Sequence, residues 1–198
     1  LLIVNANVVT PSVVLRNGWV YSKGGVIRGI GSGLAPQEAG AQVIDAGGQT
    51  LMPGFIDVHV HGAMMHDTMH ATREALQTMA MFYAAHGVTA FLATTWTDSR
   101  ARIDAALHAV KDNLGAMPNG ATLVGAHVEG PYLNPAKCGA QNLAEIRRAD
   151  RDEANAWLDL DVVRLISIAP EYPENLWLIE ACQQRGVTVS VAHTAATY

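Results

Sequence analysis

The chain has 198 residues, 49% of them hydrophobic, so it can bury a substantial core in one large domain or in a domain with a small appendage. It carries 13 lysines and arginines against 18 aspartates and glutamates, a net charge of −5, which argues against a general nucleic-acid binder because such a protein needs a basic face. No apolar run is long enough to span a bilayer, so we expect no membrane partner.

The first 52 residues predict short strands joined by tight turns. Apolar runs cover residues 2–9, 13–21 and 26–30. Asn17-Gly18 and Gly24-Gly25 are hairpin signals, because both pairs tolerate the left-handed backbone of a two-residue turn. We therefore expect a small β-sandwich-like module over residues 1–52.

After Pro53-Gly54 the pattern changes to alternating strands and helices. The expected strands cover residues 55–61, 88–95, 122–129, 162–169 and 187–193, and their β-branched, apolar character suits a parallel sheet buried on both faces. The expected helices cover residues 72–86, 98–114, 152–158 and 173–185, with Asp98 as an N-cap and Gly186 as a stop. Residues 53–198 therefore predict an α/β fold.

The polar residues favour a (β/α)8 TIM-type barrel over an open sheet. His61, Glu129 and His193 fall at or near the C-terminal ends of different strands, where such a barrel places its site. No glycine-rich phosphate-binding turn follows any strand, as an open nucleotide-binding sheet would require. Only about five of eight strands are present and no methionine starts the chain, so we expect the N-terminal portion of a longer polypeptide.

The segment FIDVHVHG, residues 55–62, predicts a metal site. Side chains two apart on a strand share a face, so His59 and His61 project together, with Asp57 on the same side. Each imidazole needs polar partners, and a divalent metal ion is the simplest partner for both. The alternative is a pair of core histidines bonded to the backbone.

Two further residues are candidate ligands on other strands. Glu129 ends an apolar strand before Gly130, and His193 ends the run VTVSVAH. A surface-paired glutamate and a neutral loop histidine are the alternatives. His127 lies one pleat deeper than Glu129, which favours a hydrogen-bonding role behind the ligands. Glu171 could be structural or could support the site.

Lysine placement narrows the ligand set. The three lysines, Lys23, Lys111 and Lys137, lie outside the expected barrel strands, so a carbamylated lysine cannot bridge two metals there. Glu129 would take that place. Mixed histidine and carboxylate ligation suits zinc or iron(II) better than magnesium or calcium. His66 and His70 could line the mouth of the site, although a solvated position fits them equally well.

Several segments together resemble the N-acetylglucosamine-6-phosphate deacetylase family of the amidohydrolase superfamily. They are PGFIDVHVHG (53–62), GAHVEGPYLNPAKCGAQN (125–142), APE (169–171) and AHTAATY (192–198). The paired histidines alone mark only the superfamily. The second and last segments, in this order, are much more specific, and the resemblance covers essentially the whole chain.

The resemblance implies roles for individual residues. Glu129 and His193 match metal ligands, and His59 and His61 match the histidines that bind a further metal in members that keep them. The backbone at Ala140 matches a contact to the substrate sugar. Gln141 stands where the family usually has a histidine near the substrate phosphate. A further metal-binding histidine and the aspartate that transfers the proton are expected beyond Tyr198, so we expect no catalytic residue in this chain and no activity from this portion alone.

The implied activity is metal-dependent hydrolysis of the acetamide of N-acetylglucosamine-6-phosphate, with one or two zinc or iron ions. The expected partner is a small amino-sugar phosphate, and a homo-oligomer is expected because such folds often form them. Cys138 and Cys182 match no metal or disulfide spacing, which predicts a reduced, cytoplasmic protein. The alternatives are an N-acetylgalactosamine-6-phosphate deacetylase, another amidohydrolase acting on a cyclic amide or nucleobase, and an inactive truncated protein.

Overall fold

The computed structural model describes residues 1–197 and divides them into two compact units. The first unit is Leu1–Pro53, and the second begins at Gly54. Tyr198, the last residue of the segment AHTAATY, lies outside the described residues.

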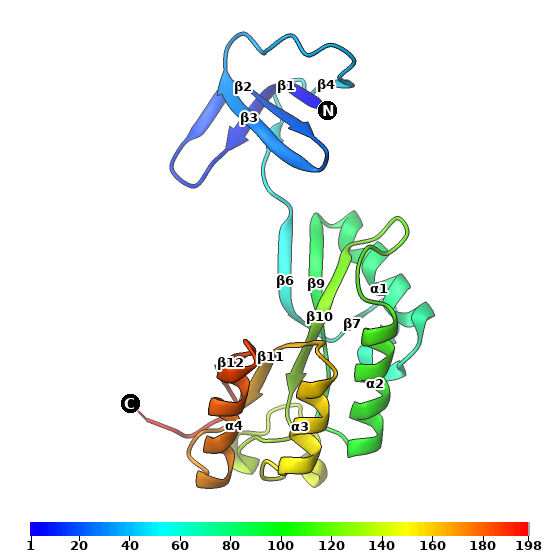
Figure 1. The fold of residues 1–198 in the computed structure, drawn as a ribbon, viewed down its shortest axis with the longest axis vertical. Helices are drawn as coiled ribbons and strands as arrows, with labels where there is room; N and C mark the ends of the chain where they lie inside the picture. The colour runs from blue at the N-terminus through cyan, green and yellow to red at the C-terminus, as the bar shows by residue number, and fades with distance from the viewer. Residues whose placement is uncertain (198) are drawn as a thin grey trace. The chain divides into compact units, whose positions relative to one another are not determined.

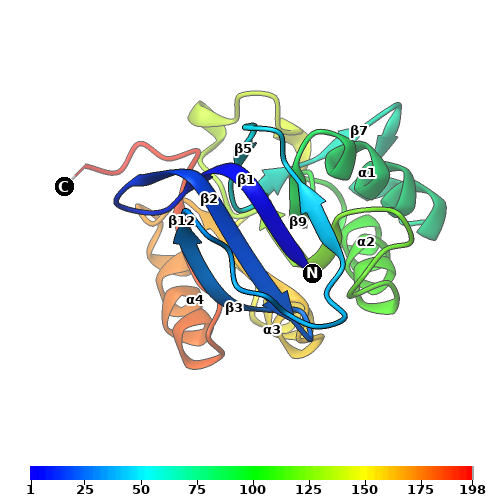
Figure 2. The same cartoon turned by 90° about the horizontal axis from the view of Figure 1, so that it is seen from above.

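The first unit is a five-stranded sheet built around its first strand. Its strands are β1 (Leu2–Val9), β2 (Val14–Lys23), β3 (Val26–Ser32), β4 (Val43–Asp45) and β5 (Thr50–Leu51). The order is β3-β2-β1-β4, and β5 also pairs with β1; the β1–β2 and β2–β3 pairs are antiparallel, whereas β4 and β5 run parallel to β1. Figure 2 shows β1, β2 and β3 side by side. The first unit thus forms a single sheet, whereas the sequence predicts a sandwich-like module.

Of the two predicted hairpins, one is confirmed and one is wrong. Gly24-Gly25 forms the turn between β2 and β3, with positive φ at both residues. Asn17-Gly18 instead lies within β2, where Asn17 takes a φ of +46° at an irregularity in the pairing with β1. A Cβ on Gly18 would lie 2.8 Å from a methyl group of Val8. The pair therefore serves a bulge and a close strand approach rather than a turn.

The second unit is a parallel sheet covered by helices. Its five main strands are β6 (Phe55–Val60), β9 (Val88–Thr94), β10 (Thr122–Glu129), β11 (Val163–Ile168) and β12 (Thr188–Val191), in the order β12-β11-β10-β9-β6. Its helices are α1 (Arg73–Ala85), α2 (Arg100–Asp112), α3 (Arg151–Asp159) and α4 (Pro173–Gln184). Figure 1 shows the helices beside the strands, and Figure 2 shows them following one another in an arc. This is a partial (β/α)8 barrel, as predicted.

Short elements occupy the connections near the C-terminal ends of the strands. They are the paired strands β7 (Gly62–Ala63) and β8 (His66–Asp67) and the 3-10 helices η1 (Thr68–His70), η2 (Pro135–Lys137) and η3 (Leu143–Glu145).

The start of α2 differs from the prediction. The N-cap is Ser99, one residue after the predicted Asp98. The carboxylate of Asp98 instead pairs with Arg102 at 2.7 Å and accepts a hydrogen bond from the Ser99 N–H group. An acidic side chain before a helix can thus satisfy a cation on the first turn in place of capping the helix.

The core lies between the sheet and the helices. Its fully buried large side chains in the second unit include Phe91, Leu107, Leu123, Trp157 and Ile166. Burial rises along β9, β10 and β11 toward their C-terminal ends. Polar groups at those ends are therefore supported by closely packed side chains. No helix among residues 1–197 is long and apolar enough to cross a membrane.

Candidate metal centre

Three of the predicted residues converge at the C-terminal ends of two strands. His59 lies on β6, His61 follows that strand, and Glu129 ends β10. One potential ligand atom from each residue lies within 4.8 Å of the others. The shared face that the two histidines were predicted to have is therefore confirmed. The carboxylate of Asp57 accepts a hydrogen bond from the backbone N–H of His59 at 3.1 Å.

Glu129 lies at the centre of this cluster, and only 7% of its side chain is exposed. Its Oε2 lies 3.0 Å from His61 Nε2, and its Oε1 lies 3.1 Å from His193 Nε2 and 3.9 Å from His59 Nε2. Burial would raise the pKa of this carboxyl, but the hydrogen bond from His61 and the neighbouring imidazoles lower the pKa below its ordinary value. Glu129 is therefore held as an anion.

His193 reaches Glu129 from a loop rather than from a strand. The sequence predicted a strand to residue 193, whereas β12 ends at Val191 and His193 takes a left-handed φ of +48°. Its Nδ1 lies 2.8 Å from the carbonyl oxygen of Lys137. Since that contact requires a proton on Nδ1, Nε2 carries the lone pair when the ring is neutral and can face a cation.

The loop that carries His193 is anchored by Glu171. One carboxylate oxygen accepts hydrogen bonds from the Ala195 N–H at 2.8 Å and from Asn134 Nδ2 at 2.7 Å, and the other accepts one from Thr194 Oγ1 at 2.5 Å. Burial would raise the pKa of Glu171, but these hydrogen bonds lower it to about 2. The Asn134 N–H also donates to the His193 carbonyl at 2.9 Å. Glu171 thus holds the loop that carries His193, which is compatible with both roles that the sequence left open.

His127 lies behind His59, as predicted for a supporting group. Its Nδ1 lies 3.2 Å from His59 Nδ1, and its Nε2 lies 2.8 Å from Ser167 Oγ. Burial lowers the pKa of His127 to about 4, so the ring is neutral at neutral pH. Ser167 was not identified from the sequence. The available signal was its position as a polar residue near the C-terminal end of a predicted strand. In the structure, Ser167 and Glu129 are register partners on the neighbouring strands β11 and β10.

Trp96 forms one wall beside the cluster. The ring of His61 stacks on it at a centroid distance of 3.7 Å and an interplanar angle of 16°. Trp96 Nε1 donates a hydrogen bond to Asp67 Oδ2 at 2.8 Å, which fixes the indole in place. Within residues 1–197, Nδ1 of His61 has no hydrogen-bond partner, so its ring is oriented by stacking and by Glu129.

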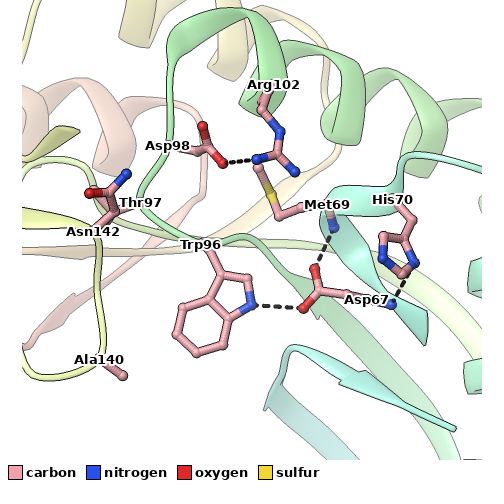
Figure 3. A pocket seen from close by; sticks show the side chains of 9 residues that line it. All are labelled: Asp67, Met69, His70, Trp96, Thr97, Asp98, Arg102, Ala140 and Asn142. Atoms are coloured by element: carbon pink, nitrogen blue, oxygen red, sulfur yellow. Dashed lines mark hydrogen bonds and ion pairs between the residues drawn. The ribbon is translucent and has the colours of Figure 1, made fainter. Parts of the chain in front are cut away.

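A pocket of about 370 Å³ opens beside Trp96 (Figure 3). Its lining includes His70, Arg102, Ala140 and Asn142. Ala140, which was predicted to contact the substrate sugar, is thus one of the residues that line this pocket. For His66 and His70 the sequence left a position at the mouth and a solvated position open; His70 lines this pocket, and the ring of His66 packs edge-on against His70 at 5.9 Å.

Gln141 points away from that pocket, toward the cluster. Its side chain is buried, with Nε2 donating to Glu129 Oε2 at 2.5 Å and Oε1 accepting from the Thr97 N–H at 2.7 Å. The flanking Ala140 and Asn142 line the pocket instead.

The chemistry of the donor set fits a divalent metal ion. His59 and His61 offer imidazole nitrogens and Glu129 offers a carboxylate oxygen, the ligand types that zinc and iron(II) accept. Glu129 is held as an anion, and His193 brings a third imidazole nitrogen to hydrogen-bond distance from it. The cluster could therefore hold a metal.

Comparison with known proteins identifies similar sequences among amidohydrolases. A model described as the amidohydrolase family matches residues 50–197. An N-acetylglucosamine-6-phosphate deacetylase of Lysinibacillus sphaericus is 34% identical over 200 residues, and an N-acetylgalactosamine-6-phosphate deacetylase of Escherichia coli O157:H7 is 33% identical over 159 residues. These alignments cover 100% and 79% of this chain, and 51% and 42% of the relatives.

A solved structure shows the same likeness. A mutant N-acetyl-D-glucosamine-6-phosphate deacetylase of Mycobacterium smegmatis, in complex with N-acetyl-D-glucosamine-6-phosphate, superposes with a TM-score of 0.87 at 28% identity. The superposition covers 100% of this chain and 51% of that chain, so this chain spans about half the length of the relatives that it matches. The family model matches most of the chain and agrees with the partial barrel and the candidate metal cluster, and the chain belongs to the amidohydrolase family.

Proposed function

We propose that the full-length protein hydrolyses the acetamide group of N-acetylglucosamine-6-phosphate to glucosamine-6-phosphate and acetate. The observation that carries this proposal is the convergence of His59, His61 and Glu129 within 4.8 Å of one another at strand ends of an amidohydrolase barrel. The similarity to deacetylases narrows the amide to an N-acetylated amino-sugar phosphate.

In this proposal, Glu129, His193, His59 and His61 hold one or two zinc or iron ions. A divalent ion in such a site activates water and polarises the carbonyl of the amide. Glu129 supplies the negative charge, since its neighbours keep it ionised despite burial. The proposal assigns the proton transfer to an aspartate of the full-length protein, as expected from the family resemblance.

The pocket beside Trp96 is the proposed entry for the sugar. Ala140, Asn142, His70 and Arg102 lie on its lining. Arg102 is already paired with Asp98 at 2.7 Å, so it would contribute little net charge to a bound phosphate. We propose that the substrate is a small molecule in the cytoplasm, in keeping with the two free thiols of Cys138 and Cys182, and that the protein acts as a homo-oligomer.

The epimeric substrate, N-acetylgalactosamine-6-phosphate, is the second candidate. The relative from Escherichia coli O157:H7 supports it at nearly the same identity as the N-acetylglucosamine-6-phosphate deacetylases. The two substrates differ in the orientation of one hydroxyl group, so a ratio of kcat/KM values decides between them.

The test is to express the full-length gene product and to measure acetate release from both sugar phosphates, together with metal content by elemental analysis. We expect Glu129→Gln and His193→Asn to lose metal and activity together. Glu180→Gln and His108→Asn, exposed residues on α4 and α2, are the matched controls and should keep both. Wild-type metal content in the first two variants would refute these ligand roles, and turnover of a cyclic amide but of neither sugar would refute the substrate.

A further inference from the structure

The side chain of Gln141 is buried inside the protein, whereas a group that contacts the substrate would be exposed in the pocket. Only 5% of the residue is exposed, and both ends of its amide are used inside the protein. Its neighbours Ala140 and Asn142 face the pocket, as Figure 3 shows for the side of the pocket opposite Asp67. A residue between two pocket-lining neighbours is thus turned into the protein.

The two hydrogen bonds determine the orientation of the amide. The Thr97 N–H group is a donor, so the Gln141 atom 2.7 Å from it must be the oxygen. The NH2 group then faces Glu129 Oε2 at 2.5 Å. Because Thr97 follows β9 and is itself buried, a rigid backbone group sets the direction of a donor aimed at the carboxylate.

The hydrogen bond to Glu129 limits how that carboxylate can rotate. The Thr95 hydroxyl accepts a hydrogen bond from the Glu129 N–H at 3.3 Å, so the backbone of Glu129 is also tied to the segment after β9. With Oε2 held by Gln141, Oε1 remains directed toward His193 and His59. A buried carboxylate held in one orientation binds a cation without first losing side-chain entropy.

We propose that Gln141 is a positioning residue that fixes the Glu129 carboxylate for metal binding, and that it acts on the metal ligand rather than on the substrate. This inference rests on the proposed metal site. In this role, residue 141 must offer both an acceptor group and a donor group. The acceptor binds the Thr97 N–H group and the donor binds the Glu129 carboxylate. A neutral histidine also offers one ring donor and one ring acceptor, so it can make the same bridge.

The test uses two substitutions in the full-length gene product. Gln141→Met keeps the length of the side chain but cannot donate a hydrogen bond, and we expect it to bind zinc about 10-fold more weakly, a typical loss when a partner behind a ligand is removed. Gln141→His restores one donor and one acceptor and should bind zinc nearly as tightly as the wild type. With zinc saturating, Gln141→Met should keep the wild-type KM.

Asn175→Leu is the matched control, because Asn175 is another fully buried amide, which bonds to the backbone of Tyr132, Ala149 and Ala169 and to no residue of the cluster. It should lower the thermal midpoint while leaving zinc affinity unchanged. A Gln141→Met variant with wild-type zinc affinity and a raised KM would overturn the inference in favour of a substrate contact. If Gln141→Met does not fold, a crystal structure of the zinc-loaded wild type decides, and a Gln141 amide directed away from Glu129 would overturn it. Failure of the wild type itself to bind zinc or iron would instead count against the proposed function.

Discussion

The Nδ1 atoms of His59 and His127 lie 3.2 Å apart, so one ring must donate a proton to the other. His127 is neutral because burial lowers its pKa to about 4, and its Nε2 faces the Ser167 hydroxyl at 2.8 Å. If His127 donates to Ser167 through Nε2, its Nδ1 accepts from His59. That arrangement places the proton of His59 on Nδ1 and leaves Nε2 free to bind a cation.

Replacing His127 tests this chain of hydrogen bonds from His59 through His127 to Ser167. His127→Phe keeps a ring of similar size but removes the acceptor that selects the His59 tautomer, and we expect zinc affinity to fall about 10- to 100-fold. Competition with a chromophoric chelator measures the change. Ser167→Ala should have a smaller effect in the same direction, and His108→Phe, on the exposed face of α2, should have none. Unchanged affinity in His127→Phe would mean that the tautomer of His59 is selected in another way.

Metal removal should destabilise the fold. His59, His61 and Glu129 converge on one site. A cation bound to the folded state alone adds about 2.7 kcal/mol when its free concentration is 100 times its Kd. We therefore expect dialysis against a chelator to lower the thermal midpoint and added zinc to restore it. Glu129→Gln should show no zinc-dependent shift. A midpoint independent of zinc in the wild type would argue against a metal in this cluster.

Glu171 should make stability depend on pH in a defined direction. Its pKa is lowered from 4.5 to about 2, so the folded state holds the carboxylate ionised more strongly than the unfolded state does. The stabilisation is complete above about pH 4.5 and is lost as the pH falls toward 2.

We expect Glu171→Gln to lower the free energy of unfolding by about 1.5 to 3 kcal/mol at pH 7, the range for hydrogen bonds to charged groups. Urea titrations at pH 7 and pH 3 should show the difference from wild type shrinking at the lower pH. Glu180→Gln, which is exposed on α4, is the control. A difference that stays constant with pH would show that Glu171 is not held as an anion.

Gly130 should tolerate no side chain. It takes a φ of +77°, and a Cβ there would overlap the hydroxyl of Thr97. Gly130→Ala should therefore destabilise the protein by more than the about 1 kcal/mol typical of a left-handed backbone alone, and it should disturb Glu129 next to it. Gly186→Ala separates the two effects, because Gly186 has a φ of +69° with open space around it. Equal losses of stability in the two variants, measured by chemical denaturation, would exclude the overlap as a cause.

Local patterns in the sequence were sufficient for much of the architecture. Two-residue periodicity placed His59 and His61 on one face, and apolar, β-branched runs predicted β6, β9, β10 and β11 to within one residue at each end. These predictions held because the alternation of side chains along a strand is a local property that the hydrophobic pattern reflects directly. The pattern was weaker where tertiary pairing overrides it: Asn17-Gly18 forms a bulge, and Asp98 pairs with Arg102.

The sequence by itself determined which residue types gather at the C-terminal ends of the strands, since chain direction in a parallel sheet brings those ends together. Only the tertiary structure decided the orientation of the side chains: that Gln141 turns inward to Glu129, that Glu171 holds the loop of His193, and that Ser167 stands behind His127. Each of these contacts joins residues far apart in the chain or in a turn without periodicity. Their geometry depends on strand register and loop closure, which no local pattern encodes.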